Sequence, residues 1–187
     1  MEIFFIDSPI GTLQIFIIEN KLYSISRPVK SLEIPLNLKS KKNALIISLK
    51  NLDKRKGYNF QQKQFLPQKK LSPLAQSLKK QLNSFFEGKG QEFKIPLYER
   101  GTLFQQKVWK ALKQIPYAET RTYSEIAKSI NNKKASRAVG NCCSKNPFLI
   151  VIPCHRVLSK TGLGGFALGL KIKKHLLRLE KSFLKGF

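Results

Sequence analysis

Cysteine and histidine are scarce in this chain, and both are absent from its first 90 residues. The 187 residues include three cysteines and two histidines, and Cys142 and Cys143 are adjacent. Three cysteines make a poor disulfide framework, which favours a reducing compartment. Together with Cys154, His155 and His175 they also lack the spaced pairs typical of structural zinc sites. We therefore expect no metal and no other cofactor.

Long apolar runs are missing as well. No run approaches the ~20 residues that a membrane span requires, so we expect no membrane partner. The N-terminus, Met1 to Phe5, has no basic region before its apolar stretch and no small-residue cleavage site. A secretory signal is therefore not expected.

Acidic residues are few: 11 Asp and Glu stand against 35 Lys and Arg, which gives a net charge of +24. Such a field attracts polyanions, above all nucleic acid. The alternative is that the many lysines reflect only a compositional bias of the genome and are ordinary solvated residues. The net charge alone does not decide between nucleic-acid binding and this compositional bias. The 42% hydrophobic content indicates a globular protein rather than a disordered basic tail. The length fits one domain or two small ones, with a core large enough to need no disulfide or metal.

The first half of the chain predicts a small sheet and one helix. Residues 1–30 are rich in β-branched and aromatic side chains interrupted by two turns, which predicts an antiparallel meander. Residues 30–70 are rich in Lys, Asn and Gln around an apolar patch at 44–49, and they predict no clear element. Ser72 and Pro73 are a typical helix start, and the helix is expected to end at Gly88. Its apolar face is expected to comprise Leu74, Leu78, Leu82 and Phe85.

The second half is predicted to be mostly helical. Thr102 caps a helix that Pro116 stops, and Thr122 and Glu125 form a capping box for a short helix ending at Ile130. Asn131 and Asn132 supply a tight turn, because Asn tolerates the left-handed conformation. A second short helix at 134–144 completes a helix-turn-helix candidate, and a last helix is expected at 171–184. The apolar positions of the first and last of these helices are Phe104, Val108, Ala111, Leu112 and Ile115, and Ile172, Leu176, Leu179 and Phe183.

The helix at 134–144 has two different faces on a helical wheel. Ala135, Ala138, Val139 and Cys142 share a small apolar face, which suggests that Cys142 is a buried core thiol. Arg137, Asn141 and Ser144 lie on the opposite face. In a helix-turn-helix that face enters a DNA groove, and the alternative is an ordinary solvated polar face.

A thiol, an imidazole and a guanidinium follow one another at Cys154, His155 and Arg156, directly after an apolar run and Pro153. A nearby imidazole or cation favours the reactive thiolate. Adjacent residues in an extended strand face opposite ways, so a turn or a bridging water is needed for Cys154 and His155 to cooperate. The glycine-rich stretch at 161–165 would let backbone approach a ligand. The alternative is a buried structural cysteine beside a surface basic pair.

Several motifs in one order resemble the O6-alkylguanine-DNA alkyltransferases, also called methylated-DNA–protein-cysteine methyltransferases. The resemblance is dense over about 101–181, with a further match at Ser8 to Leu13. The matching segments are Gly101 to Gln105, Val108-Trp109, Ile115 to Tyr117, Thr122-Tyr123, Ala135 to Gly140, Asn146-Pro147, Ile150 to Val157, Gly164 to Phe166 and Leu176 to Glu180.

The resemblance implies a single-turnover DNA repair reaction. A flipped-out O6-alkylguanine gives its alkyl group irreversibly to Cys154, and O4-alkylthymine is a second candidate substrate. His155 acts as base toward Cys154 through a water, and Glu180 holds the His155 ring. Asn146 braces the turn before the active-site strand, and Tyr123 hydrogen-bonds the guanine.

The resemblance also implies the remaining contacts with DNA. Arg137 fills the space left in the base stack, and Ala135, Ser136 and Asn141 lie on the DNA-binding helix. The backbone of Cys154, Val157, Phe166 and Ala167 contacts the flipped base. The partner is double-stranded DNA approached through its minor groove, by a monomer that is cytoplasmic and nucleoid-associated, or nuclear in a eukaryote.

Three departures from the family pattern affect the expected pocket. Phe166 stands where many relatives have Tyr, which removes a hydroxyl near the base. Leu168 replaces a glycine, and would be strained if that position required a positive φ. Asn131, Asn132 and Lys133 replace a turn that contains Gly and Pro.

The implied fold is α/β plus α. Residues 1–92 form a ribonuclease-H-like α/β domain with an antiparallel sheet, and residues 93–187 form a winged-helix-like domain with the helix-turn-helix. The alternatives are a non-reactive protein that recognises alkylated DNA, a Cys–His hydrolase and a generic basic DNA-binding protein. Because Cys154 is present, the transferase is preferred to the non-reactive protein.

Overall fold

The computed structural model describes residues 1–27, 71–89 and 92–184, which belong to one compact unit. The apolar patch at 44–49 lies outside the described residues. Helices predominate, beside a small antiparallel sheet, so the α/β character expected from the sequence is observed. Within the described residues, no helix is long and apolar enough to cross a membrane.

The predicted meander is confirmed as a three-stranded sheet in the order β1-β2-β3. The strands are β1 Glu2–Ile6, β2 Leu13–Ile18 and β3 Lys21–Ser26. β1 pairs antiparallel with β2, for example Phe4 with Ile15, and β2 pairs antiparallel with β3. All six residues of the central strand are buried, as expected for a strand covered on both sides.

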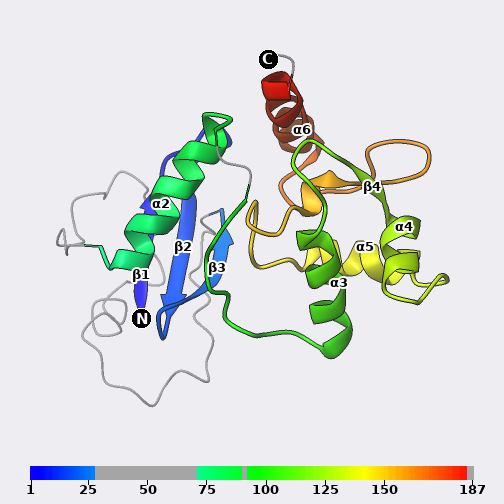
Figure 1. The fold of residues 1–187 in the computed structure, drawn as a ribbon, viewed down its shortest axis with the longest axis horizontal. Coiled ribbons are helices and arrows are strands. Elements are labelled where there is room, and N and C mark those ends of the chain that lie inside the picture. The colour runs from blue at the N-terminus through cyan, green and yellow to red at the C-terminus, as the bar shows by residue number, and fades with distance from the viewer. Residues whose placement is uncertain (28–70, 90–91, 185–187) are drawn as a thin grey trace, which may run out of the picture. The chain divides into compact units, whose positions relative to one another are not determined.

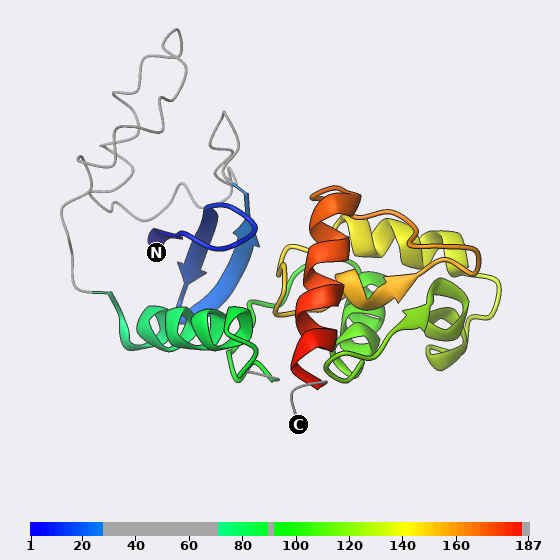
Figure 2. The ribbon, with the colours of Figure 1, turned by 90° about the horizontal axis from the view of Figure 1, so that it is seen from above.

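Helix α2, Pro73–Phe86, lies along this sheet in both views (Figures 1 and 2). The Ser72 hydroxyl accepts from Ala75 N, and Gly88 takes a positive φ of 74° after the last turn, so both expected ends are confirmed. The predicted apolar face is buried together with Ala75.

The edge strand β3 also forms backbone hydrogen bonds with segments from the second half of the chain. Leu22 N donates to Pro96 O, and Ile25 N donates to Pro147 O, both at 2.8 Å. The sheet edge is thereby tied to the stretch that leads to Cys154. The expected division between residues 92 and 93 remains a prediction.

The two short helices predicted as a helix-turn-helix are α4 Tyr123–Ser129 and α5 Ser136–Ser144, and α3 Leu103–Lys113 precedes them. Capping boxes at Thr102 and Thr122 start α3 and α4, as predicted. Asn131 has a φ of +58°, so the predicted left-handed turn residue is also confirmed.

Two helix boundaries differ from expectation. α5 begins at Ser136 rather than 134, because Ala135 N bonds Asn132 O in a turn before the helix. α3 ends at Lys113, before Pro116, since Gln114 N and Ile115 N bond three residues back. Such tightened last turns are common at helix ends.

The last part of the chain returns to this helical region. The strands β4 Arg121–Thr122 and β5 Val157–Leu158 pair in parallel, which the sequence analysis did not foresee. Helix α6, Leu170–Leu184, begins one residue before the expected start, after Gly169 with φ +88°. It packs against the 3₁₀ turn η2, Cys154–Arg156.

Candidate active site

An irregular turn delivers Cys154 to the site. Residues 148–157 are all buried, and the chain turns between Phe148 and Ile152, whose N–H bonds Phe148 O at 2.9 Å. Ile150 has a φ of +71°, which is unfavourable for a β-branched residue. The structure around this turn must therefore hold a strained backbone in place.

Asn146 bridges that turn. Its Nδ2 donates to Ile152 O at 2.8 Å, and its Oδ1 accepts from Phe148 N at 3.0 Å. The same Nδ2 lies 3.2 Å from Cys154 Sγ. One amide thus fixes both the backbone of the turn and the sulfur that follows it.

The Cys154 thiol is almost fully buried, with 3% of the residue exposed. Burial raises its pKa, and the Asn146 hydrogen bond and the Lys173 charge oppose that rise. A buried thiol with a raised pKa needs a base to become nucleophilic.

His155, the next residue in the chain, is the candidate base. Its Nε2 lies 2.7 Å from Glu180 Oε1, and both side chains are buried. A carboxylate acceptor assigns the ring proton to Nε2, which leaves Nδ1 as an acceptor. Nδ1 is buried and has no hydrogen-bond partner among the described residues. Burial lowers the pKa of His155, against the opposing effect of Glu180, so the neutral ring is favoured.

Glu180 is the centre of a buried charge network. Its oxygens accept from His155, from Arg156 Nε at 2.9 Å, from Arg156 Nη2 at 3.0 Å and from Ala118 N at 2.9 Å. Burial alone would raise its pKa, but His155 and Arg156 outweigh burial and lower it. The carboxylate therefore remains ionised and keeps the His155 ring oriented.

Arg156 is buried, not exposed, so the alternative of a surface basic pair is wrong. Its Nη1 donates to Ile115 O at 2.7 Å, and its guanidinium lies 5.5 Å from the centre of the Tyr117 ring. With its bonds to Glu180, the guanidinium ties the Cys154 turn to α6 and to the end of α3.

Tyr123 contacts the glycine-rich loop at 161–165. Tyr123 Oη donates to Gly165 O at 3.4 Å, and burial raises the pKa of its phenol. Gly164 has a φ of +66°, and a Cβ there would lie 2.8 Å from the Tyr123 ring. The expected close approach of this loop is therefore observed, with Tyr123 as its neighbour.

The departures at Phe166 and Leu168 have modest structural effects. The Phe166 ring lies edge-on to His155, with centroids 6.5 Å apart, and Ala167 is exposed. The positive φ values of this loop fall on Gly164 and Gly169, and Leu168 is not among the described residues with positive φ. The strain considered for Leu168 is therefore absent.

The outer face of α5 is as predicted. Arg137, Asn141 and Ser144 are exposed, Ala135 and Ser136 are half-buried, and Cys142 is buried. Cys143, for which nothing was predicted, is buried as well, and burial raises its pKa to about 12.

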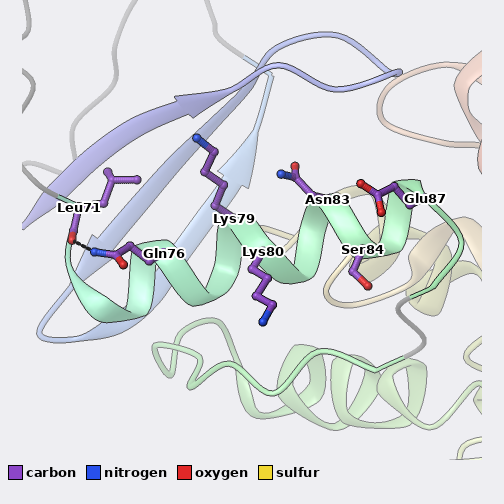
Figure 3. Close-up of a pocket in the computed structure, with 7 residues that line it drawn as sticks. All are labelled: Leu71, Gln76, Lys79, Lys80, Asn83, Ser84 and Glu87. Atoms are coloured by element: carbon purple, nitrogen blue, oxygen red, sulfur yellow. Dashed lines mark hydrogen bonds between the residues drawn. The ribbon is translucent and has the colours of Figure 1, made fainter.

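A surface hollow along α2 is unrelated to these residues. Figure 3 shows the residues that line it, among them Lys79, Lys80 and Glu87, with Gln76 bonded to Leu71 O. None of the predicted site residues lines it.

Comparison with known proteins places this chain in a family. A family model described as 6-O-methylguanine DNA methyltransferase, DNA binding domain, matches residues 103–182. A Methanosarcina acetivorans methylated-DNA–protein-cysteine methyltransferase is 55% identical over 104 residues, which cover 55% of this chain and 67% of the relative. A Haemophilus influenzae protein of the same name is 44% identical over 133 residues, covering 66% of this chain and 73% of the relative.

The chain belongs to the methylated-DNA–protein-cysteine methyltransferase family. A crystal structure of Mycobacterium tuberculosis OGT in complex with DNA has a TM-score of 0.69 and 36% identity, covering 96% of this chain and 92% of that one. The similarity to this family member therefore extends beyond the segment that carries the motifs.

Two buried charged residues of this candidate site escaped the sequence analysis. Arg156 was seen only as part of a triplet, and Lys173 on α6 was not singled out, although it is fully buried. The available signal was the unusual position of Glu180 at the edge of an apolar stripe, since a buried carboxylate requires cationic or hydrogen-bonding partners. Nothing local identified which cations those are.

Proposed function

We propose that this chain repairs alkylated DNA by transferring the alkyl group of O6-alkylguanine to Cys154, once per molecule. The observation that carries the proposal is a buried cysteine held by Asn146 beside a histidine that is oriented by Glu180. Family membership supplies the reaction class. The same membership, and a family member in complex with DNA, support DNA as the partner.

The chemistry follows from the atoms available. A water takes the Cys154 proton and passes its own to His155 Nδ1, which has no hydrogen-bond partner in the described part of the chain. The sulfur attacks the alkyl carbon, so the S–C bond forms while the C–O6 bond breaks and its electron pair leaves on guanine. Glu180 stabilises the imidazolium that results. The thioether does not hydrolyse, so the molecule reacts once.

Tyr123 and the backbone of Val157, Phe166 and Ala167 are proposed to receive the base. Tyr123 already donates to Gly165 O, which brings its phenol to the loop that precedes Phe166. From there the phenol would hydrogen-bond the leaving guanine. The same pocket would decide whether O4-alkylthymine is accepted.

The exposed face of α5 is the proposed DNA contact. In the minor groove, Arg137 would occupy the gap left by the flipped base. Asn141, Ala135 and Ser136 would lie near the sugar-phosphate backbone of the DNA. The net charge of +24 would add sequence-independent phosphate contacts with a steep salt dependence.

The finer fold assignment belongs to this proposal. We infer a ribonuclease-H-like domain over 1–92, supported by the antiparallel meander with α2 along it, and a winged-helix-like domain over 93–187. The protein is proposed to act as a monomer in the compartment that holds the cell's DNA.

The decisive experiment is intact-mass spectrometry after incubation with a duplex containing one O6-methylguanine. Wild type should gain one methyl group, about 14 Da, mapped to Cys154, and Cys154→Ala should gain none. Lesion-selective binding without mass gain would favour the non-reactive recognition protein instead. Absence of both would leave a generic basic DNA-binding protein.

A further inference from the structure

Phe85 is the last buried residue of α2, and its side chain reaches His155. The centroids of the two rings are 6.3 Å apart, and the ring planes meet at 71°. Aromatic pairs prefer such edge-to-face arrangements, at centroid separations of about 4.5–7 Å. Both side chains are fully buried. The helix that lies along the sheet of the first half therefore also contacts the proposed base.

A second ring contacts His155 from the loop after β5. The Phe166 centroid lies 6.5 Å from that of His155, but Phe166 is only half-buried. Phe166 also belongs to the loop that is proposed to receive the flipped base of the DNA. Groups on helices are held more precisely than groups on loops. Phe85 is therefore the better fixed of these two rings.

Other aromatic rings hold Phe85 in place. The Phe93 ring, which precedes α3 in the chain, lies 5.8 Å from the Phe85 ring. The Tyr117 ring, which follows α3, lies 6.1 Å from it. The guanidinium of Arg156 lies over the same Tyr117 ring. Phe85 thus packs against His155 directly, and against the ring that contacts Arg156.

Burial is the largest influence on the charge of His155, and it lowers the pKa of the imidazole. From α6, Glu180 opposes this effect by bonding the ring, whereas the Lys173 charge acts in the same direction as burial. From the same turn, the Arg156 charge also acts in the direction of burial. The neutral ring, which can accept a proton, therefore depends mainly on the exclusion of water.

Two further titratable groups of this region are neutral. Burial raises the pKa of the Cys154 thiol and of the Tyr117 phenol, so neither is charged near pH 7. From α2, the contact with His155 is the apolar Phe85 ring. A smaller side chain at position 85 would leave space beside the imidazole. Water entering that space would stabilise the imidazolium and would let the ring turn away from Glu180.

We propose that Phe85 is a positioning residue for the transfer reaction, whose ring holds the His155 imidazole against Glu180 and excludes water from it. A helix of the first half of the chain thereby contributes to the chemistry of the second half. This inference rests on the proposed function for its effect on transfer. Its effect on His155 itself can be measured without DNA.

The test compares Phe85→Leu with wild type. Leucine keeps an apolar side chain in the core but removes the ring that contacts His155. Leu78→Ala is the matched control, because Leu78 is also fully buried on α2 and lies about 10 Å along the helix from Phe85. It removes packing from the same helix without touching the ring contact. Circular dichroism and thermal unfolding establish that each variant is folded.

The first measurement is the titration of His155 by nuclear magnetic resonance of the imidazole C–H groups, from pH 4.5 to 9 without DNA. The sequence has two histidines, so His155→Asn assigns both signals, and the exposed His175 is the internal reference. In Phe85→Leu, the His155 signal should titrate at a pH about 0.5 higher than in wild type, because water stabilises the charged ring. Leu78→Ala should match wild type. An unchanged His155 titration in folded Phe85→Leu would overturn the proposal.

The second measurement is single-turnover transfer from an O6-methylguanine duplex at pH 5.5 and pH 8. Phe85→Leu should lose about threefold or more at the lower pH, where a base that titrates at a higher pH is more often protonated, and less at the higher pH. Wild-type rates at both pH values would overturn the role in transfer. The same loss at both pH values with an unchanged His155 titration would leave a structural role only. If wild type itself transfers nothing, the proposed function fails, whereas the titration still tests Phe85.

Phe85→Met is the second variant if Phe85→Leu is poorly folded. Methionine fills irregular space in a core but presents no rigid ring to His155. The His155 signal should again titrate at a higher pH than in wild type, and transfer at pH 5.5 should fall by about twofold or more. A wild-type titration together with a wild-type transfer rate in folded Phe85→Met would count against the proposal.

Discussion

The 2.7 Å contact between His155 Nε2 and Glu180 Oε1 joins a turn to a helix that begins 14 residues later, with neither side chain exposed to solvent. The same carboxylate holds Arg156 and the backbone of Ala118. Glu180 therefore has two functions. It orients the proposed base, and it pairs a guanidinium that would otherwise be a buried lone charge.

Removing Glu180 should therefore affect both stability and transfer. We expect Glu180→Ala to lower the free energy of unfolding by about 3–5 kcal/mol, because the Arg156 charge is left buried without its partner. Glu180→Gln should fold better but transfer about 10- to 100-fold more slowly, since the imidazolium loses its counter-charge. Urea unfolding and single-turnover transfer measure the two effects.

The matched control is Glu119→Ala, which removes the exposed Glu119–Arg121 pair. Exposed pairs contribute about 0–1 kcal/mol, so this variant should be nearly as stable as wild type. Equal losses in Glu119→Ala and Glu180→Ala would contradict the central position assigned to Glu180.

Stability should fall as the pH falls, in two windows. The pKa of His155 is lowered from 6.5 by burial, so below about pH 6.5 the unfolded chain binds a proton that the native state resists. The pKa of Glu180 is lowered from 4.5. Its contribution to the free energy of unfolding is therefore complete above about pH 4.5 and is lost as the pH falls below that value. Urea midpoints at successive pH values measure both slopes.

Two substitutions isolate the first window. His155→Asn removes the residue whose charged form is disfavoured, so its stability should depend less on pH just below 6.5. His175→Asn changes the other histidine, which is exposed on α6, and should retain the wild-type slope. An unchanged slope in His155→Asn would mean that other groups cause the effect.

Local signals in the sequence were enough to predict the helices, whereas the contacts within the site could be seen only in the three-dimensional structure. The caps at Ser72, Thr102 and Thr122 are read from four consecutive residues, and all three are observed. The left-handed Asn131 follows from its own side chain. Each of these features depends on residues that are close in sequence, which is why they were predictable.

The missed features are all long-range. The parallel pairing of β4 with β5 joins residues 36 apart, such as Arg121 and Val157. The burial of Arg156 depends on Glu180 and on a carbonyl at the end of α3. Lys173 lies seven residues before Glu180, at the same edge of the apolar stripe, and its ammonium is satisfied by the carbonyls of Val157 and Leu163, which are distant in sequence. Periodicity alone gave no sign of these contacts.

Arg137→Ala should slow transfer from duplex DNA more than it weakens binding to undamaged DNA. The exposed guanidinium is proposed to fill the gap left by the flipped base, so its loss affects flipping specifically. We expect at least a tenfold slower transfer and about a tenfold or smaller loss of non-specific affinity. Lys110→Ala, an exposed charge in the last turn of α3, should leave the transfer rate unchanged at saturating DNA. Equal loss of binding and transfer in Arg137→Ala would indicate a simple phosphate contact instead.

Gly164 and Gly165 provide a paired test of the base pocket. Gly164 has a φ of +66°, and a Cβ there would lie 2.8 Å from the Tyr123 ring and 2.9 Å from its hydroxyl. At Gly165, a Cβ would meet no atom of the described residues within 4 Å. Gly164→Ala should therefore lower the free energy of unfolding by about 1–3 kcal/mol and displace Tyr123 or the loop.

The pair of variants separates pocket shape from loop flexibility. Both replace one loop glycine by alanine, so both reduce backbone freedom, but only Gly164→Ala forces the loop and Tyr123 apart. We expect transfer to fall by at least tenfold in Gly164→Ala and by less than threefold in Gly165→Ala, measured in single turnover on the same O6-methylguanine duplex. Adding Tyr123→Phe to Gly164→Ala should lower the transfer rate little further, because the phenol is already displaced. If Tyr123→Phe lowers the transfer rate as much in the Gly164→Ala protein as in wild type, then Tyr123 acts independently of the Gly164 contact.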